Sequence, residues 1–113
     1  MRMRKKPNLI PRMERCARLL ADHPEALRGN WRSLKPDAKA VWLEIGCGKG
    51  RFSAQMAAQN PDVLYVALER VPDAMVIAME RCLKAGLTNI FFLDADAAQL
   101  RDYFAPGEVD RIF

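Results

Sequence analysis

The sequence contains little that could build a metal centre, a disulfide framework or a membrane segment. Only three cysteines are present, at positions 16, 47 and 82, and they are too far apart for disulfide or metal-ligand spacing. The single histidine, His23, stands beside a proline in an irregular stretch, which is typical of a surface residue. No apolar run approaches the roughly 18 residues that a bilayer span requires. We therefore expect no metal, no membrane segment and a reducing, cytoplasmic location.

A secretory signal is also not expected, because Pro7 and Pro11 interrupt the basic N-terminus and no apolar core follows it. An arginine-rich organelle presequence stays open as the less favoured alternative. Half of the 113 residues are apolar and 28% are charged, which is the balance of a globular protein. A chain of this length predicts one small domain.

Basic residues are concentrated towards the N-terminus. Residues 1–40 hold eleven of the eighteen lysines and arginines but only four of the fourteen acids, in a chain of net charge +4. A basic segment attached to a mildly acidic body predicts a polyanionic partner, most often nucleic acid. A solvated N-terminal segment fits the charge pattern equally well. We interpret residues 1–39 as a basic arm, extended to Pro11, with a short helix over 11–21 and an irregular connection beyond it.

From residue 40 onwards, apolar runs alternate with helical patterns. Buried strands are predicted at 40–45, 63–68 and 90–93, helices at 51–59, 72–85 and 97–104, and a further apolar run from 109. Short connections between such elements favour right-handed crossovers and a parallel sheet with flanking helices. The sequence therefore predicts a Rossmann-like α/β fold, in which ligands bind beyond the carboxyl ends of the strands.

The segment LEIGCGKG at 43–50 follows the first predicted strand. Its glycines, Gly46, Gly48 and Gly50, fall one residue short of the dinucleotide fingerprint G-x-G-x-x-G. Glu44 stands two places before the first glycine, and a carboxylate 4 Å from a phosphate would be repelled by on the order of 4 kcal/mol at reduced dielectric. The same carboxylate suits a ligand with a positively charged end.

Acidic residues also follow the second and third strands. Glu69 is placed to accept hydrogen bonds from ribose hydroxyls, and Asp94 and Asp96 follow the third strand. S-adenosyl-L-methionine carries a sulfonium, an ammonium and a ribose but no phosphate. The sequence therefore favours this cofactor over NAD.

Several segments together resemble bacterial tRNA (guanine-N7-)-methyltransferases over nearly the whole chain. They are MRMRKKP at 1–7, LEIGCGKGRF at 43–52, LERVPDAMVIAMER at 68–81 and FLDADA and FAPGEVDRIF at 92–97 and 104–113. The resemblance implies a Rossmann-like methyltransferase fold and transfer of a methyl group from S-adenosyl-L-methionine to N7 of guanine 46 in the variable loop of tRNA. That nitrogen has a lone pair and no proton, so the reaction needs positioning rather than a base.

The resemblance also implies roles for individual residues. Glu44 and Glu69 correspond to acids that contact the cofactor, and Asp96 corresponds to the acid near the adenine, with Asp94 as the second candidate. The tRNA phosphates would be bound by the cations of the arm, Arg2, Arg4, Lys5, Lys6 and Arg12. Lys49 and Arg51 flank the glycine loop and face either RNA or solvent. Cys47 has no partnered histidine and is interpreted as a space-filling residue.

Members of this family continue beyond the fourth strand into an N-F-S-D-P-W-P-K-K-R-H type segment, which supplies an aspartate near the methyl group. This sequence ends at Phe113, so we expect residues 40–113 to be the cofactor-binding half, truncated after about the fourth strand, with the catalytic aspartate beyond Phe113. We also expect self-association through the exposed sheet edge. The alternative is a non-catalytic tRNA- or RNA-binding module with an empty methyltransferase-like fold.

Overall fold

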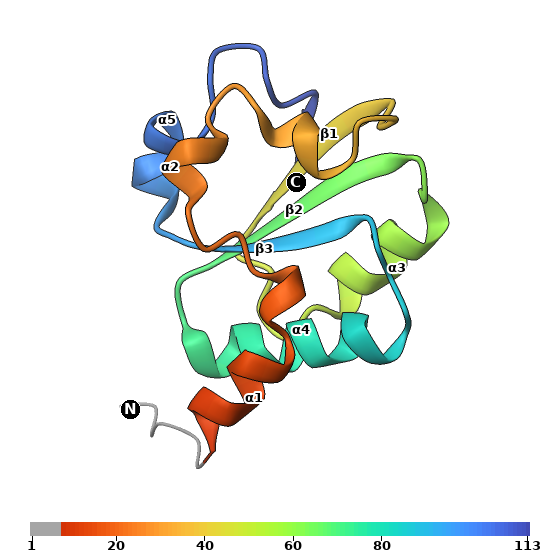
Figure 1. Cartoon of the computed structure of the whole chain (residues 1–113), viewed down its shortest axis with the longest axis vertical. Coiled ribbons are helices and arrows are strands. Elements are labelled where there is room, and N and C mark those ends of the chain that lie inside the picture. Colours follow the sequence, from red (N-terminus) through yellow and green to blue (C-terminus); the bar gives the residue numbers. More distant parts are fainter. Residues whose placement is uncertain (1–7) are drawn as a thin grey trace.

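The computed structural model describes residues 8–113, so four of the predicted RNA-binding cations, Arg2, Arg4, Lys5 and Lys6, lie outside the described residues. Within this range the chain forms a four-stranded sheet in the order β3-β2-β1-β4, and every neighbouring pair is parallel (Figure 1). The strands are β1 (Ala40–Ile45), β2 (Val63–Glu69), β3 (Ile90–Asp94) and β4 (Arg111–Ile112). The three long strands lie where the apolar runs predict them.

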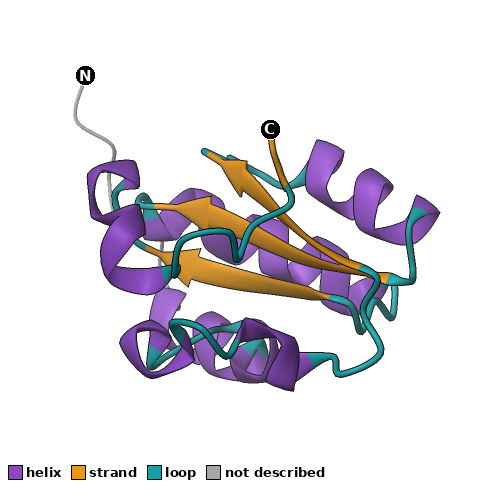
Figure 2. Ribbon diagram, turned by 90° about the horizontal axis from the view of Figure 1, so that it is seen from above, coloured by secondary structure: helices purple, strands orange, loops and turns teal. Residues whose placement is uncertain are grey.

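Helices cover both faces of the sheet, as the view along the layers shows (Figure 2). One face packs against α1 (Leu9–Arg15), α3 (Arg51–Gln59) and α4 (Pro72–Lys84). The other face is covered by α2 (Pro24–Leu27), α5 (Leu100–Tyr103) and the 3-10 helix Trp31–Leu34. A further 3-10 helix, Ala97–Gln99, precedes α5. The predicted parallel sheet with flanking helices is therefore present.

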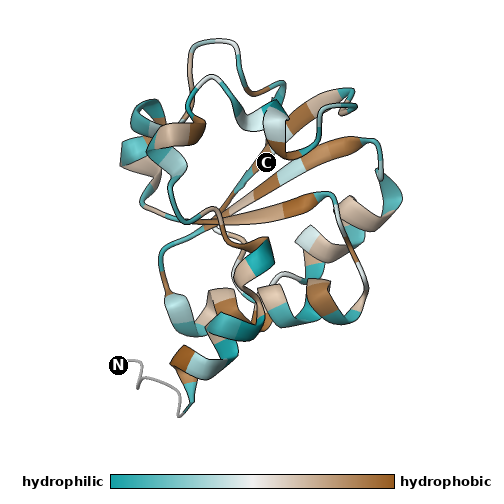
Figure 3. Ribbon diagram, viewed as in Figure 1, coloured by the Kyte–Doolittle hydropathy of each residue, from teal (hydrophilic) through white to brown (hydrophobic). Residues whose placement is uncertain are grey.

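β2 lies inside the sheet and is buried on both faces, so most of its residues are apolar. The apolar colouring follows the strands in Figure 3. All six residues from Val63 to Leu68 are buried. Tyr65 and Ala67 face the α3–α4 layer, whereas Leu64 and Val66 face the layer of α2 and α5. A continuous apolar run is what a parallel strand between two helical layers requires.

The N-terminal helix differs from the prediction in position. α1 begins at Leu9, inside the segment predicted to be extended, and it is followed by a 3-10 helix at Ala17–Leu19 instead of continuing to residue 21. Pro11 is the third residue of α1, where its missing N–H costs no intrahelical hydrogen bond. Beyond the 3-10 helix, the Ala21 N–H donates to the Phe92 carbonyl at 2.9 Å, so this segment lies along the free side of β3.

The connection before β1 contains two short helices, where the sequence predicts at most one. Its anchor is Trp31, which is fully buried and stacks on Phe104 with ring centroids 4.8 Å apart. The indole N–H donates to the Tyr103 carbonyl at 2.7 Å, which satisfies the polar atom of this buried ring. Long-range contacts from later in the chain thus order a segment that has little local periodicity.

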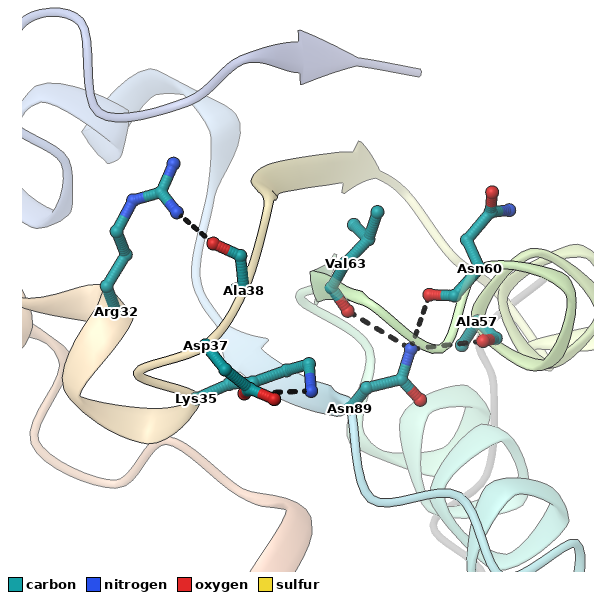
Figure 4. Close-up of polar contacts among 8 residues, drawn as sticks. All are labelled: Arg32, Lys35, Asp37, Ala38, Ala57, Asn60, Val63 and Asn89. Carbon is teal, nitrogen blue, oxygen red and sulfur yellow. Dashed lines mark hydrogen bonds and ion pairs between the residues drawn. The ribbon is translucent and has the colours of Figure 1, made fainter.

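Asn89 fixes the end of the molecule where β2 begins. Its buried side-chain amide donates to the carbonyls of Ala57, Asn60 and Val63 at 3.0, 3.0 and 3.1 Å (Figure 4). These bonds join the end of α3, the start of β2 and the segment before β3. The opposite end of the sheet, where the strands finish, carries the glycine loop.

Within residues 8–113, none of the helices has both the length and the apolar content that a membrane crossing requires. The same described residues contain no group of three or more His, Cys, Asp or Glu side chains that could hold a metal ion.

Candidate cofactor site

The carboxyl ends of the strands bring the glycine loop and the predicted acids to one edge of the sheet. The loop follows β1, Glu69 ends β2, and Asp94 ends β3 opposite Glu69 in the parallel register. A pocket of about 270 Å³ opens between these strand ends. It is lined by Ile45, Gly46, Leu68, Glu69, Arg70, Ala95, Asp96 and Ala97. Of the two candidate acids after the third strand, therefore, Asp96 lines the pocket and Asp94 does not.

Most backbone N–H groups at the start of the glycine loop are bonded within the protein. Those of Gly46 and Cys47 both donate to the Leu68 carbonyl, at 2.9 and 3.0 Å. That of Gly48 donates to Glu69 Oε1 at 2.8 Å. In a dinucleotide site, free loop N–H groups would be directed at the pyrophosphate. These bonds therefore favour a ligand without phosphates.

The glycines of the loop serve different purposes. Gly46 and Gly48 have φ of 78° and 56°, and a Cβ added at either position would meet no atom within 4 Å. Gly50 also has φ of 78°, but its added Cβ would lie 2.5 Å from the Ala78 Cβ on α4. Gly50, predicted as a cofactor-binding residue, thus allows α3 to pack closely on α4. Only Gly46 lines the pocket.

Glu69 joins the glycine loop to the start of α4. Besides the bond from Gly48, its Oε2 accepts hydrogen bonds from the N–H groups of Arg70 and Val71 at 3.2 and 3.1 Å. Three backbone donors hold the carboxylate at the pocket, and each carboxylate oxygen can accept more than one bond. A hydroxyl-bearing ligand, such as a ribose, would find an oriented acceptor here.

Asp96 lies across the pocket and caps the 3-10 helix that begins at Ala97. Its Oδ1 accepts the Ala98 N–H at 3.0 Å, and its Oδ2 pairs with Arg70 Nη1 at 3.1 Å. The Ala98 hydrogen bond and, beyond it, the Arg70 charge lower the pKa of Asp96 below its usual value. For Asp94, burial and the neighbouring Glu69 charge raise the pKa. Of the two acids after β3, Asp96 is therefore the one that lines the pocket and whose pKa is lowered.

Glu44 has a more internal position than the sequence suggests. Its carboxylate is buried, and Oε1 accepts hydrogen bonds from Ser53 Oγ and from the Tyr65 hydroxyl, both at 2.6 Å. This cluster ties β1 to α3 and β2 beneath the glycine loop, and Glu44 is not among the residues that line the pocket. Sequence reasoning missed Ser53 and Tyr65. Tyr65 could have been found from the sequence, because a tyrosine in a strand predicted to be buried needs a hydrogen-bond partner for its hydroxyl.

Cys47 is a buried, neutral thiol. Burial, and after it the charges of Glu44 and Glu69, raises the pKa of Cys47 to about 12. A thiol with this pKa is not a nucleophile at neutral pH. The interpretation as a space-filling residue fits this environment.

Arg12 is the one predicted RNA-binding cation within the described residues. Its guanidinium forms two bonds to the Glu80 carboxylate, 2.9 Å from Nε to Oε2 and 2.5 Å from Nη2 to Oε1. This pair docks α1 on α4, so the structure gives Arg12 a structural partner, and its RNA contact stays a prediction.

A larger pocket of about 550 Å³ lies on the other face of the sheet, between β4 and the segment after α5. Its lining includes Leu43, Phe104, Pro106 and Ile112, with Arg28 and Arg101 as the charged members. It contains no carboxylate and is away from the glycine loop. The smaller pocket is therefore the candidate cofactor site.

Comparison with known proteins places the chain among methyltransferases. The family model described as "Putative methyltransferase" matches residues 38–113. The chain is 34% identical to a tRNA (guanine-N(7)-)-methyltransferase of Bacillus cytotoxicus and 37% identical to one of Geobacillus kaustophilus. Both matches cover all of this chain and 52% of the relative, so the chain spans about half the length of these curated relatives.

A solved structure shows the same fold. The S-adenosyl-L-methionine complex of Haemonchus contortus phosphoethanolamine N-methyltransferase 2 matches with a TM-score of 0.56 at 21% identity, covering 82% of this chain and 20% of that one. The predicted Rossmann-like methyltransferase fold is confirmed, and so is the resemblance to the tRNA (guanine-N7-)-methyltransferases. Because the family model matches residues 38–113, this chain belongs to the methyltransferase family that the model describes.

Proposed function

We propose that this chain is the cofactor-binding half of an enzyme that transfers a methyl group from S-adenosyl-L-methionine to N7 of guanine 46 in the variable loop of tRNA. The observation that carries the proposal is an acid-lined pocket beside a glycine loop whose leading N–H groups are bonded within the protein. Two relatives named as tRNA (guanine-N(7)-)-methyltransferases, 34% and 37% identical along the whole chain, support the substrate. A cytoplasmic location accompanies this proposal, since tRNA is the substrate.

The residues around the pocket fit this cofactor. Ile45, Leu68 and Ala95 offer apolar surface to a purine, while Glu69 and Asp96 supply acceptors at the two sides. Glu44 lies below the loop and contributes negative charge from a buried position. When bound, the cofactor supplies an electrophilic methyl group. Guanine N7 needs no deprotonation, so the task of these residues is to bind and orient.

Calorimetric titration with S-adenosylhomocysteine tests the cofactor assignment. Glu69→Ala should weaken binding about 10- to 150-fold, the range expected for losing a hydrogen bond to a charged group. Asp62→Ala is a matched control, because Asp62 stands immediately before β2, at the opposite end of that strand. Equal binding by the wild type and Glu69→Ala, or no binding by a folded wild type, would contradict the assignment.

A methyl-transfer assay distinguishes the proposed methyltransferase from the alternative function, a tRNA- or RNA-binding module without catalysis. Incubation with methyl-labelled S-adenosyl-L-methionine and unmodified tRNA should label the tRNA if the chain is catalytically competent. A binding module with an empty fold would retain the tRNA, transfer no label and bind no S-adenosylhomocysteine, whereas a cofactor-binding half without its catalytic aspartate would still bind S-adenosylhomocysteine.

A further inference from the structure

Phe52 is unusual in being a large aromatic side chain exposed next to the glycine loop. It stands in the first turn of α3, directly after that loop, and 46% of it is accessible to solvent. The other large exposed apolar residues in the described part of the chain are aliphatic, namely Ile10, Ile45 and Ile112. Neither the hydrophobic core nor the cofactor pocket accounts for this ring.

The exposed ring packs against other aromatic side chains. Phe52 meets Phe113 edge to face, with centroids 5.6 Å apart and an interplanar angle of 69°. Phe113 in turn packs edge to face on Trp42 at 5.6 Å and lies nearly parallel to Tyr65 at 6.2 Å. Such contacts favour one orientation of each ring. Phe52 is therefore a surface ring whose edge-to-face contact with Phe113 favours one orientation.

The surroundings of this aromatic cluster are positively charged. Lys49 and Arg51 are exposed on either side of Gly50, and the Arg111 guanidinium lies over the Phe113 ring at 4.6 Å. Among residues 8–113, none of these three cations forms an ion pair with a carboxylate. An aromatic face bordered by unpaired cations complements a planar base joined to a phosphate backbone. An acidic or apolar protein surface would use only one of these two features.

We propose that Phe52 is a stacking platform for an unpaired RNA base, with Lys49 and Arg51 contacting the flanking phosphates. The platform rests on the proposed function in one respect, because it lies beside the cofactor loop, where a methyl-accepting RNA must approach. Stacking on an aromatic ring tolerates any base, so the platform would hold the strand while other contacts select the target.

Fluorescence of 2-aminopurine in the loop of a short RNA hairpin tests the proposal, since stacking quenches this base. Phe52→Leu keeps the apolar contact with Phe113 but removes the aromatic face, and it should weaken RNA binding about 5- to 150-fold and abolish the quenching. Phe52→Trp should retain both. Ile112→Thr is the matched control, because this exposed apolar residue lines the pocket on the opposite face of the sheet. Its RNA affinity should equal that of the wild type.

The proposed phosphate contacts of Lys49 and Arg51 are tested separately, by the salt dependence of RNA binding. Lys49→Gln and Arg51→Gln should each lower the slope of log K against log salt by about 1 while the quenching by Phe52 persists. This readout also holds if Phe52→Leu fails to fold. Unchanged slopes together with quenching that survives Phe52→Leu would overturn the platform.

Two further outcomes distinguish the stacking platform from the cofactor assignment and from an interface between two copies of the chain. If the wild type binds no S-adenosylhomocysteine but its RNA binding depends on Phe52, the cofactor assignment fails and the platform stands. If the wild type binds RNA no better than Phe52→Leu does, and sedimentation shows a dimer that Phe52→Leu dissociates, the surface is an interface between copies and the platform is wrong.

Discussion

The glycine loop offers a direct comparison between a packing glycine and a conformational one. Replacing Gly50 by alanine forces an L residue to adopt φ of 78° and places a Cβ 2.5 Å from the Ala78 Cβ and 2.7 Å from its Cα. The left-handed conformation costs about 1–2 kcal/mol. The overlap with α4 adds about 1–3 kcal/mol, since the contacted Cα belongs to the backbone and cannot swing away. We expect a total loss of about 2–5 kcal/mol in the free energy of unfolding.

Gly48→Ala is the matched control. Its φ of 56° carries the same conformational cost, but its added Cβ meets nothing within 4 Å. We expect a loss of only about 1–2 kcal/mol. Urea unfolding followed by tryptophan fluorescence measures both, because the buried Trp31 becomes exposed on unfolding.

Ala78→Gly provides the second test of this reasoning. Removing the Ala78 Cβ relieves the shortest contact, so the loss caused by Gly50→Ala should be smaller in the Ala78→Gly background than in the wild type. The reasoning is refuted if Gly50→Ala and Gly48→Ala lose the same free energy of unfolding. It is also refuted if the loss in the Gly50→Ala/Ala78→Gly double variant equals the sum of the two single losses.

Other measurements follow from the same contacts. Tyr65→Phe should cost about 1.5–3 kcal/mol in urea unfolding, because Glu44 loses a buried hydroxyl donor at 2.6 Å; a loss below 0.5 kcal/mol would contradict this account of the buried cluster. Cys47, with a thiol pKa of about 12, should react with a disulfide reagent at pH 8 far more slowly in the native protein than in urea, and equal rates would be the contrary result. The hydrogen bond from Arg12 lowers the pKa of Glu80 below 4.5, so the ion pair stabilises the fold above that pH and the stabilisation is lost as pH falls through the lowered value. Glu80→Gln should therefore flatten the acid limb of a stability–pH curve, and an unchanged limb would argue against it. The predicted self-association through the β4 edge is checked by sedimentation, where a monomer at all concentrations would show that prediction to be wrong.

The sequence by itself determined the order of strands and helices and the edge of the sheet where the site lies. Buried parallel strands need long apolar runs, and such runs mark β1, β2 and β3 directly. Because parallel strands all end at one edge, residues that follow each strand must gather there whatever their side chains touch. The positions of Gly46, Glu69 and Asp96 were therefore accessible from the order of elements alone.

Only the tertiary structure decided what each of these residues contacts. Glu44 turns to Ser53 and Tyr65, which are 9 and 21 positions along the chain, and Gly50 faces Ala78 on a different helix. A local pattern specifies the side of a strand or helix on which a residue lies. Which residue it contacts on that side is decided by how remote segments of the chain pack together. That packing depends on the shape of every side chain between the segments.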